Sequence, residues 1–587
     1  MTFLRISGAL AALVMTTSCV TAGLPSSNNG VWNEASETPR EGEAYSDFLI
    51  ARFAAMTNDP VEAAQRYAAA IETAPDDSGI AERAVFSSLL AGEYDRAVKL
   101  AKVAERRGSD ATLIKLTLGV DAIERDDQKR AAALLDETSF GPFNRMVARG
   151  LSAWGVSESD GAEAAVEYLT DVLTGDPSLD SATLYLMGLI QMSAGDDEAA
   201  LVTFGTLWAD GARLAVGVEA YAELLAADGD RAQAVGVLKN FRATVGQNAS
   251  LQTLRKSIEG GDVITPRRLS TKQGAALALY VPAAALTMQT DDDLAGVYFV
   301  LALALNPDLH VARSLWGQAL DNAGRRTEAI EVLEGIPVES EFYATARGQM
   351  AWAYRREEQN QKALDVAGEA LAHSPDRDLK VQLSDLYRSM ERHGEAEAVL
   401  TEIITEDALE GRTDWRLLYA RGAAREQLGR WPEAEADLRA AIRINPDDAS
   451  LLNYLGYAYV DRGKNLNEAF DLIRKAVALK PNSGYIVDSL GWAHYRFGRY
   501  DMALRYLERA VELEPADSVL NDHLGDVYWQ LGRRLEARFQ WERALKLGPS
   551  DRDRAIIEDK LGGAPPEAVL LNADAGLGQS HLARQAQ

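Results

Sequence analysis

The 587-residue sequence predicts an all-α solenoid of about fourteen antiparallel helix pairs with one insertion. The first observation is a spacing, because small residues recur along the chain in steps that are mostly 33 to 35 residues long. The second is the frame around each of them: a small residue about twelve positions before, an apolar or aromatic residue four after, and often a Pro twelve after. A repeat of this length is typical of solenoids, in which each helix pair packs only against its neighbours. The recurring residues are Ala63, Ala97, Ala131, Ala165, Ala200, Ala234, Ala295, Ala329, Ala363, Ala396, Ala434, Ala469, Ala503 and Ala537.

Each position of the frame has a packing reason, which the last four units show best. Gly and Ala stand where two helices must approach to roughly 8–10 Å, since a larger side chain would push them apart. Pro ends the second helix because it lacks an amide hydrogen and crowds the preceding turn, and an Asp or Ser after it can cap the next helix. The opening glycines and closing prolines of these units are Gly422, Gly456, Gly491 and Gly525, and Pro446, Pro481, Pro515 and Pro549.

This frame resembles the tetratricopeptide repeat over about residues 44 to 551. The resemblance implies a right-handed superhelical solenoid in which the first helix of each unit lines the concave side. An ordinary helical bundle whose Ala residues recur by chance is the alternative, but it would not hold one register along the chain. Eight of the fourteen units carry the closing proline, namely Pro75, Pro177, Pro307, Pro375, Pro446, Pro481, Pro515 and Pro549.

The first residues predict export from the cell. Arg5 is the only charge before the apolar stretch Ile6–Met15, which is too short to span a membrane but suits a secretory signal. The following Thr16–Cys19 resembles the lipoprotein box of bacteria, in which cleavage before the cysteine leaves it to carry a lipid. Cys19 is also the only cysteine of the chain. Residues 1–18 are therefore predicted as a signal peptide and Cys19 as a lipidation site.

A tether is predicted to join the lipid to the solenoid. Residues 19–43 are rich in Ser, Asn, Gly and Glu, a composition that suits a flexible segment. Val20 rather than Asp follows the cysteine, and by resemblance to the enterobacterial sorting rule this favours the outer membrane. We expect a protein that is lipid-anchored in the bacterial cell envelope, at the outer membrane, with its solenoid facing the periplasm.

The repeat register breaks once. The step from Ala234 to Ala295 is 61 residues, and the excess contains the short helical run Ser250–Glu259. We predict a bend at this insertion between six units and eight, and a kink or shortening of the next helix at Pro282. The predicted segments are an N-terminal repeat solenoid at 44–246, an insertion at 247–274 and a C-terminal repeat solenoid at 275–551.

The end of the chain predicts a cap. Residues 552–561 read as a polar terminal helix of the kind that closes a solenoid. The residues after Gly562 are rich in Ala, Gly and Gln, which predicts a disordered tail. The segment 552–587 is therefore predicted as a capping helix followed by a disordered tail.

The charge balance narrows the class of partner. The chain has 61 Lys and Arg against 88 Asp and Glu, a formal net charge of −27. Such a field repels nucleic-acid backbones and anionic membrane surfaces, so we expect no nucleic-acid partner and membrane contact through the lipid only. A partner with a basic face is favoured.

The sequence offers little for catalysis. The six histidines are scattered and none belongs to a His-Glu-x-x-His motif or a metal-spaced cluster, and no phosphate-binding loop or nucleophile elbow occurs. We predict no enzyme activity, no cofactor and no metal. His494 and His523 lie in first helices of adjacent units, where a packing or surface role is favoured over a joint one. The histidines are His310, His373, His393, His494, His523 and His581.

The exposed positions of the last first helices predict a protein-binding groove. They combine aromatic rings, which give contact area at low entropy cost, with carboxylates that would select a basic or amide-rich partner. In the alternative, some of these rings pack between helices. The two-carboxylate clamp of chaperone adaptors needs Lys, Arg and Asn in these positions, so a chaperone-tail receptor is disfavoured. The predicted groove residues are Asn453, Tyr457, Tyr485, Asp488, Trp492, Tyr495, Arg496, Asp522, Asp526 and Trp529.

A second resemblance concerns function. The stretch Leu451–Arg534 resembles the C-terminal part of long repeat lipoproteins of Gram-negative bacteria, and Ala275–Pro307 is similar to their central unit. One branch of that group is the lipoprotein partner of a periplasmic C-terminal-processing protease and delivers cell-wall hydrolases to it. The resemblance implies a non-catalytic adaptor with protein or peptide partners, among them such a protease and its hydrolase substrates.

Two other functions stay open at this point. The first is a scaffold for polysaccharide export or outer-membrane biogenesis, which a neighbouring gene for a synthase or an export barrel would indicate. The second is an enzyme or a sugar-binding protein that uses the aromatic groove, which bound glycan in a purified sample would indicate.

Overall fold

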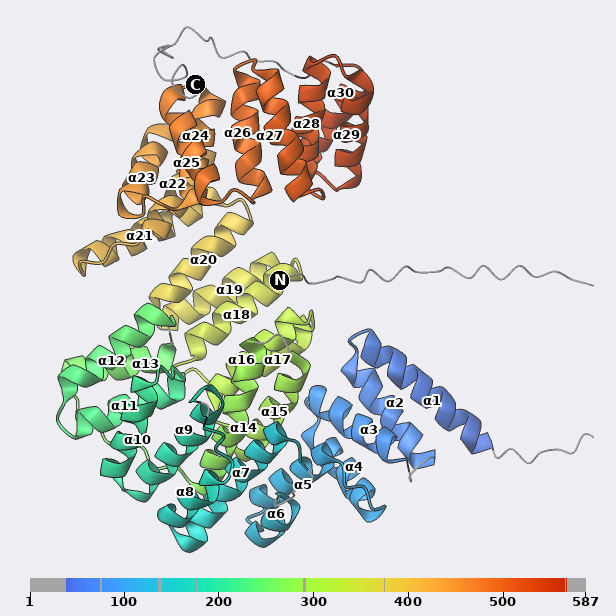
Figure 1. The fold of residues 1–587 in the computed structure, drawn as a ribbon, viewed down its shortest axis with the longest axis vertical. Helices are drawn as coiled ribbons and strands as arrows, with labels where there is room; N and C mark the ends of the chain where they lie inside the picture. Colours follow the sequence, from blue (N-terminus) through green and yellow to red (C-terminus); the bar gives the residue numbers. More distant parts are fainter. Residues whose placement is uncertain are drawn as a thin grey trace, which may run out of the picture. The chain divides into compact units, whose positions relative to one another are not determined.

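A computed structural model shows an all-helical chain, and its described part holds thirty helices, α1 to α30 (Figure 1). The all-α prediction is confirmed for these residues. The predicted signal peptide, Cys19 and most of the tether lie outside the described residues, as does the tail. The described residues are 39–73, 77–135, 140–175, 177–246, 248–288, 292–373, 375–564 and 566.

The chain divides into two compact units, residues 1–114 and 115–587. In the first unit α1 packs against α2, α2 against α3 and α3 against α4. The first helix begins at Pro39, inside the predicted tether. The helices of this unit are α1 (Pro39–Met56), α2 (Pro60–Thr73), α3 (Ser78–Leu90) and α4 (Tyr94–Arg106), and α5 (Thr112–Glu124) crosses into the second.

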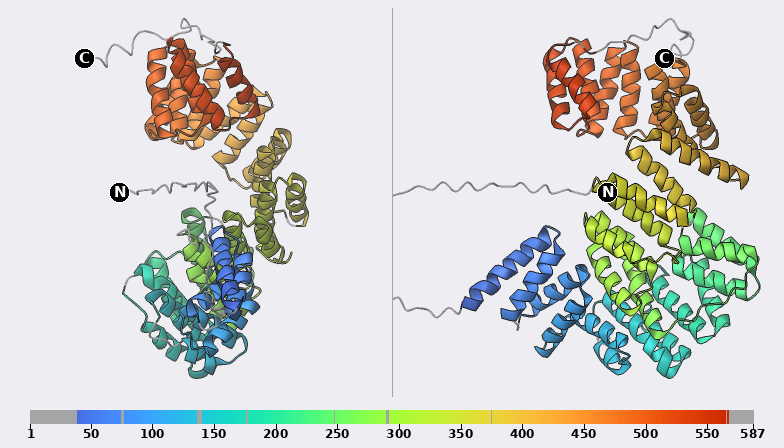
Figure 2. Two further views of the ribbon diagram at one scale, coloured as in Figure 1. Left: turned by 90° about the vertical axis from the view of Figure 1, so that its right-hand side faces the viewer. Right: turned by 180° about the vertical axis from the view of Figure 1, so that it is seen from behind.

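The second unit contains the remaining pairs, and Figure 2 shows them from two further sides. The last helix covers the residues predicted for the cap. The helices are α6 (Gln128–Leu135), α7 (Pro142–Asp160), α8 (Ala162–Thr170), α9 (Pro177–Ala194), α10 (Asp197–Ala209), α11 (Ala215–Ala227), α12 (Arg231–Thr244), α13 (Ala249–Gly260), α14 (Thr271–Met288), α15 (Asp292–Leu305), α16 (His310–Asn322), α17 (Arg326–Glu334), α18 (Tyr343–Arg356), α19 (Asn360–His373), α20 (Arg377–Ser389), α21 (His393–Leu409), α22 (Trp415–Gln427), α23 (Trp431–Ile444), α24 (Ala449–Arg462), α25 (Leu466–Leu479), α26 (Gly484–Arg496), α27 (Tyr500–Leu513), α28 (Ser518–Gln530), α29 (Arg534–Lys546) and α30 (Asp551–Leu561).

The recurring Ala residues lie in the second helix of every pair, from α2 to α29. Their side chains are at most 2% exposed. The opening glycines allow the predicted close approach of the paired helices. A Cβ on Gly525, for example, would lie 2.5 Å from Trp541 of the paired helix. The capping prediction also holds at α24, where the side chain of Asp448 accepts a hydrogen bond from the amide of Leu451 at 2.8 Å. The frame therefore sets both the close approach of the paired helices and the start of the next one.

The insertion returns the chain to helices that precede it by several repeats. After α13, helix α14 packs against α7 and α9. Gly274 of α14 lies so close to Trp154 of α7 that a Cβ there would be 2.1 Å from the indole. Pro282 does not shorten α14, which continues for 18 residues with Pro282 buried inside it. Burial of the surrounding apolar side chains outweighs the one lost backbone hydrogen bond.

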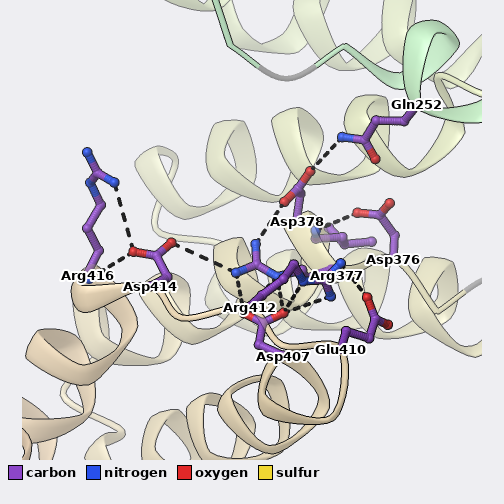
Figure 3. Close-up of polar contacts among 10 residues, drawn as sticks. Gln252, Asp376, Arg377, Asp378, Asp407, Glu410, Arg412, Asp414 and Arg416 are labelled. Atoms are coloured by element: carbon purple, nitrogen blue, oxygen red, sulfur yellow. Dashed lines mark hydrogen bonds and ion pairs between the residues drawn. The ribbon is translucent and has the colours of Figure 1, made fainter. Parts of the chain in front are cut away.

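The insertion also contacts a later part of the chain. Gln252 of α13 donates a hydrogen bond to Asp378 of α20 at 3.4 Å (Figure 3). Asp378 stands beside Arg377, which pairs with the buried Asp407 of α21 at 2.6 Å. Helix α13 is thus tied to a polar network between α20 and α21.

Candidate protein-binding surface

The predicted groove residues lie on three first helices, α24, α26 and α28. Helix α26 packs against both α24 and α28, so the three form one continuous surface, here called the first-helix surface (Figure 1). This follows from the frame, because corresponding positions of successive first helices are about one repeat apart. Asn453 and Tyr457 are on α24, Tyr485, Asp488, Trp492, Tyr495 and Arg496 on α26, and Asp522, Asp526 and Trp529 on α28.

Exposure separates these residues into two groups. Tyr485 is 43% exposed, and it is the most open of the ten. Four others are less than 9% exposed, so they pack between helices, and among them Tyr495 is the one aromatic ring. The buried four are Asn453, Asp488, Tyr495 and Asp526, and the half-buried five are Tyr457, Trp492, Arg496, Asp522 and Trp529.

The indole of Trp492 is held by ring stacking on both α26 and α28. Its ring centroid lies 4.6 Å from that of Tyr495, with an interplanar angle of 12°. The imidazole of His523 stacks on it at 3.9 Å and 15°. Offset or parallel aromatic contacts of this kind stabilise a fixed ring position. Trp492 is therefore a rigid aromatic contact at the centre of the first-helix surface.

The carboxylates of this surface are paired inside the protein. Nδ1 of His523 lies 3.0 Å from Asp488, and Nζ of Lys560 lies 2.8 Å from both Asp522 and Asp526. Nε1 of Trp541 donates to Asp526 at 3.0 Å. Burial, with the neighbouring Asp522, raises the pKa of Asp526 to about 6. The sequence predicted that these carboxylates select a basic or amide-rich partner. In the structure, His523 and Lys560 largely balance their negative charge.

Sequence reasoning missed the role of Lys560, although a signal for it existed. Lys560 comes 34 residues after Asp526, the length of one repeat. Extending the frame by one more first helix would have placed this ammonium next to Asp526. Helix α30 is that helix, and it packs against α29 as a first helix of a further unit would.

The α24 side of the surface keeps an unsatisfied polar atom. Oδ1 of Asn453 is buried and has no hydrogen-bond partner among the described residues. On the same surface, the hydroxyls of Ser450 on α24 and Tyr485 on α26 form a hydrogen bond of 2.9 Å. Buried polar atoms are nearly always paired, so this amide oxygen is an exception in the packing between the helices. The guanidinium group of Arg496 contacts Asp461 at 3.5 Å.

His494 of α26, for which a packing or surface role was favoured, packs against aromatic rings. The imidazole of His494 stacks on Tyr506 at 5.5 Å and an interplanar angle of 2°, and meets the edge of Phe470 at 5.2 Å. Burial lowers the pKa of His494 to about 4. Within the described ranges, no group of three His, Cys, Asp or Glu side chains could hold a metal ion. Over the same ranges, no helix is long and apolar enough to cross a membrane.

Comparison with known proteins gives a family match in the C-terminal part of the chain. Residues 339–552 match the family model of the tetratricopeptide repeat. A TPR repeat-containing protein of Pseudomonas aeruginosa is 35% identical over 146 residues, which is 24% of this chain and 25% of that protein. Superkiller complex protein 3 of Mus musculus is 35% identical over 120 residues, 20% of this chain and 8% of that protein. The matched segments thus span a quarter or less of these relatives.

Two solved structures that align with this chain do so at low similarity. The crystal structure of the APC/C hetero-tetramer Cut9–Hcn1 aligns with 89% of this chain and 96% of its own chain, at 14% identity and a TM-score of 0.37. A tetratricopeptide repeat protein from Parabacteroides merdae aligns with 43% of this chain and 97% of its own, at 16% identity and a TM-score of 0.37. With the helix pairs and the family match, the fold is that of a tetratricopeptide-repeat solenoid, a type of scaffold for protein–protein interaction.

Proposed function

We propose that this protein is a non-catalytic adaptor of the bacterial envelope that binds segments of partner proteins on its first-helix surface. In this proposal Cys19 carries the lipid, the solenoid faces the periplasm, and the bound segments belong to cell-wall hydrolases that are presented to a C-terminal-processing protease. The tetratricopeptide repeats support the general part of the proposal, namely a scaffold for protein partners. The resemblance of Leu451–Arg534 to repeat lipoproteins motivates the specific part.

The observation on which the proposal rests is a surface that carries both a fixed indole and an exposed phenol. Trp492 is held by two ring contacts, and Tyr485 is 43% exposed. A peptide segment would supply apolar side chains for these rings. Rigid aromatic side chains are frequent centres of binding energy in protein interfaces. The surface therefore suits a peptide segment better than a catalytic reaction.

Charge gives the partner a further property. The chain as a whole is strongly acidic, although Asp488, Asp522 and Asp526 are paired internally. Long-range attraction would speed the approach of a basic partner, while the local contacts at Trp492 and Tyr485 would hold it. We therefore expect high salt to slow the association of the partner and to leave the lifetime of the complex mostly unchanged.

Co-purification tests this function. The anchored full chain is isolated from its host by mild detergent, with the parent compared to Tyr485→Ala plus Trp492→Ala, and to Arg505→Ala on α27 as a matched control. Arg505 is exposed on a second helix. We expect a C-terminal-processing protease and cell-wall hydrolases with the parent and the control, and their loss from the double variant. Recovery of polysaccharide-export or outer-membrane-assembly proteins instead would favour the alternative scaffold function, and equal recovery with the double variant would contradict a role for this surface.

The anchor is tested separately by fractionation. Cys19→Ala would leave the chain without its lipid and would move it from the membrane to the soluble fraction. A Cys19→Ala variant that stays in the membrane fraction as the parent does would contradict the lipid anchor without bearing on the binding surface.

A further inference from the structure

Helix α1 of the first unit carries an exposed apolar stripe. Phe53 and Met56 are 68% and 77% exposed, and Tyr45 and Leu49 are exposed as well. In chain order these four side chains are spaced by four, four and three residues, so they lie along one face of the helix. We call them the α1 stripe.

The other face of α1 packs on α2. Ala51 and Ala54 are buried, and the ring of Phe48 meets the ring of Tyr67 on α2 in a T-shaped contact with centroids 6.0 Å apart. The α1 stripe lies on the side of the helix away from these contacts. In an internal repeat of a solenoid, the neighbouring repeat would cover that side.

The outer surface of α1 differs from the outer surface of α30, the last helix of the second unit. A solenoid end needs a polar outer surface, because no further repeat covers it. The exposed side chains of α30 are mostly charged and meet this need. The α1 stripe instead holds two aromatic and two aliphatic side chains, which gain free energy when they leave water. We therefore expect apolar side chains to cover it.

The sequence before α1 contains a suitable side chain. Residues 20–38 are mostly small or polar, and Trp32 is the only aromatic residue among them. Val31 precedes it, and residues 33–38 contain no large apolar side chain. These residues lie outside the described part of the chain. Along the sequence, Trp32 is thus the nearest large apolar side chain that precedes α1.

The length of this segment matches the position of the α1 stripe. Phe53 comes 14 positions after Pro39, which is about 21 Å along a helix. Trp32 comes seven positions before Pro39, and seven extended residues span about 23–25 Å. A residue that precedes a proline favours an extended backbone, and Thr38 is such a residue. A segment that runs back along α1 therefore brings Trp32 to the level of Phe53.

We propose that residues 31–38 fold back along α1 and that the indole of Trp32 packs on Leu49 and Phe53. The short connection gives the indole an effective concentration in the millimolar range at the α1 stripe, which favours it over a second copy of the chain. If Cys19 carries a lipid, this docking shortens the free part of the tether to residues 20–30. That consequence rests on the function proposed above, whereas the docking itself does not.

Cleavage of the purified full chain by a Glu-specific protease tests the docking. Glu34 and Glu37 lie in the docked segment, which should protect them. Trp32→Ser and Phe53→Ser should each speed cleavage at these two sites by about tenfold or more, because burial of one large apolar side chain favours the docked state by at least that factor. Leu535→Ser, at a residue of α29 that is 82% exposed, is the matched control and should be cleaved like the parent. Parental rates in both docking variants would overturn the proposal.

Disulfide trapping tests the position of the segment along α1. A Cys19→Ala chain has no cysteine, and Val31→Cys with Met56→Cys adds two thiols just beyond Trp32 and the middle of the α1 stripe. We expect rapid formation of the disulfide, and Trp32→Ser should slow it by about tenfold or more while leaving the connecting chain unchanged. Equal rates with and without Trp32 would show that the connection alone brings the thiols together, and would overturn the docking.

Light scattering distinguishes this docking from pairing of α1 with a second copy of the chain. We expect the same mass for the parent, Trp32→Ser and Phe53→Ser. A dimer that Phe53→Ser dissociates and Trp32→Ser leaves intact would assign the α1 stripe to a second copy and would overturn the proposal. None of these three measurements depends on the lipid, so failure of the anchor would leave their outcome unchanged.

Discussion

Buried carboxylates in this chain are held by cations from neighbouring helices. Asp407 of α21 is 2% exposed and contacts Arg377 at 2.6 Å and Arg412 at 2.8 Å (Figure 3). Burial alone would raise the pKa of Asp407, but the two guanidinium groups outweigh it and hold the pKa below its ordinary value. Such a carboxylate stabilises the fold only while it is ionised, which makes its contribution dependent on pH.

Asp407→Asn should therefore destabilise the protein at neutral pH and not in acid. The stabilisation is complete above the ordinary aspartate pKa of about 3.9 and is lost as the pH falls through the lower value of the folded state. At pH 7 we expect a loss somewhat below the roughly 3–5 kcal/mol typical of fully buried pairs, because both arginines are partly exposed. Urea unfolding from pH 7 to pH 2 measures the difference. An equal difference at all pH values would contradict the ionic origin.

An exposed pair serves as the control for Asp407. Glu395 contacts Arg392 at 2.7 Å, and the two side chains are 47% and 42% exposed. Solvent screens such a pair, so Glu395→Gln should leave the free energy of unfolding at pH 7 nearly unchanged. A similar loss for both variants would mean that burial does not decide the contribution.

The ammonium of Lys560 supports the end of the solenoid. Its side chain is 9% exposed, and it contacts Asp522 and Asp526, which are 16% and 5% exposed. Lys560→Met should cost about 3–5 kcal/mol, because it removes the ion-pair partner of the buried Asp526 and of the half-buried Asp522. Hydrogen exchange should then speed up in α28, α29 and α30. Adding Asp526→Asn should recover part of this loss, and strictly additive effects would contradict a direct interaction.

At the scale of single elements, side-chain volume sets the distance between paired helices. Gly525 of α28 faces Trp541 of α29, where an added Cβ would be 2.5 Å from the indole. Gly368 of α19 has the opposite environment, since it is exposed and nothing lies within 4 Å of its added Cβ. The frame requires glycine at the first position and merely tolerates it at the second.

The two glycines should respond to alanine with opposite signs. Gly525→Ala should destabilise the chain by about 1–3 kcal/mol, because Trp541 is fully buried and cannot move away easily. Gly368→Ala should stabilise it by roughly 0.5–1 kcal/mol, since alanine restricts the unfolded chain and favours the helix. Thermal unfolding of both variants is the measurement. Stabilisation by Gly525→Ala would show that the helices are not in close contact there.

The sequence predicted these elements because their causes are local to one repeat. The Ala at the centre of each second helix, the opening glycine and the capping Asp all lie within about 34 residues of their contacts. The pairing of Asp526 with Lys560 is one repeat long as well, yet it was missed because α30 was interpreted only as a polar cap. Burial of Asp488 and Tyr495 depends on neighbouring helices and could not be read from their positions in the frame.

At the scale of the second unit, the insertion connects distant repeats. It follows α12 but places α14 against α7 and α9, and its α13 contacts α20. No pattern in the sequence indicated this return. The spacing of apolar residues predicts where a helix forms, but it does not predict which distant helix packs against it. The bend predicted at residues 247–274 remains a prediction about the path of the solenoid.

Gly274→Val tests the return of the chain directly. The wild-type contact leaves no room for a Cβ beside Trp154, so valine should separate α14 from α7. We expect faster hydrogen exchange in α7, α9 and α14 together, with α28 and α29 unchanged, because distant repeats of a solenoid respond independently. Unchanged exchange in α7 would contradict the packing of α14 on it.

The proposed binding of partners to the first-helix surface can be tested by in-cell photocrosslinking. Benzoylphenylalanine is placed at Tyr485 on α26 or at Arg505 on α27, both of which are exposed. We expect position 485 to crosslink a C-terminal-processing protease or its hydrolase substrates, and position 505 not to do so. Crosslinks to these proteins from position 505 and none from position 485 would contradict it.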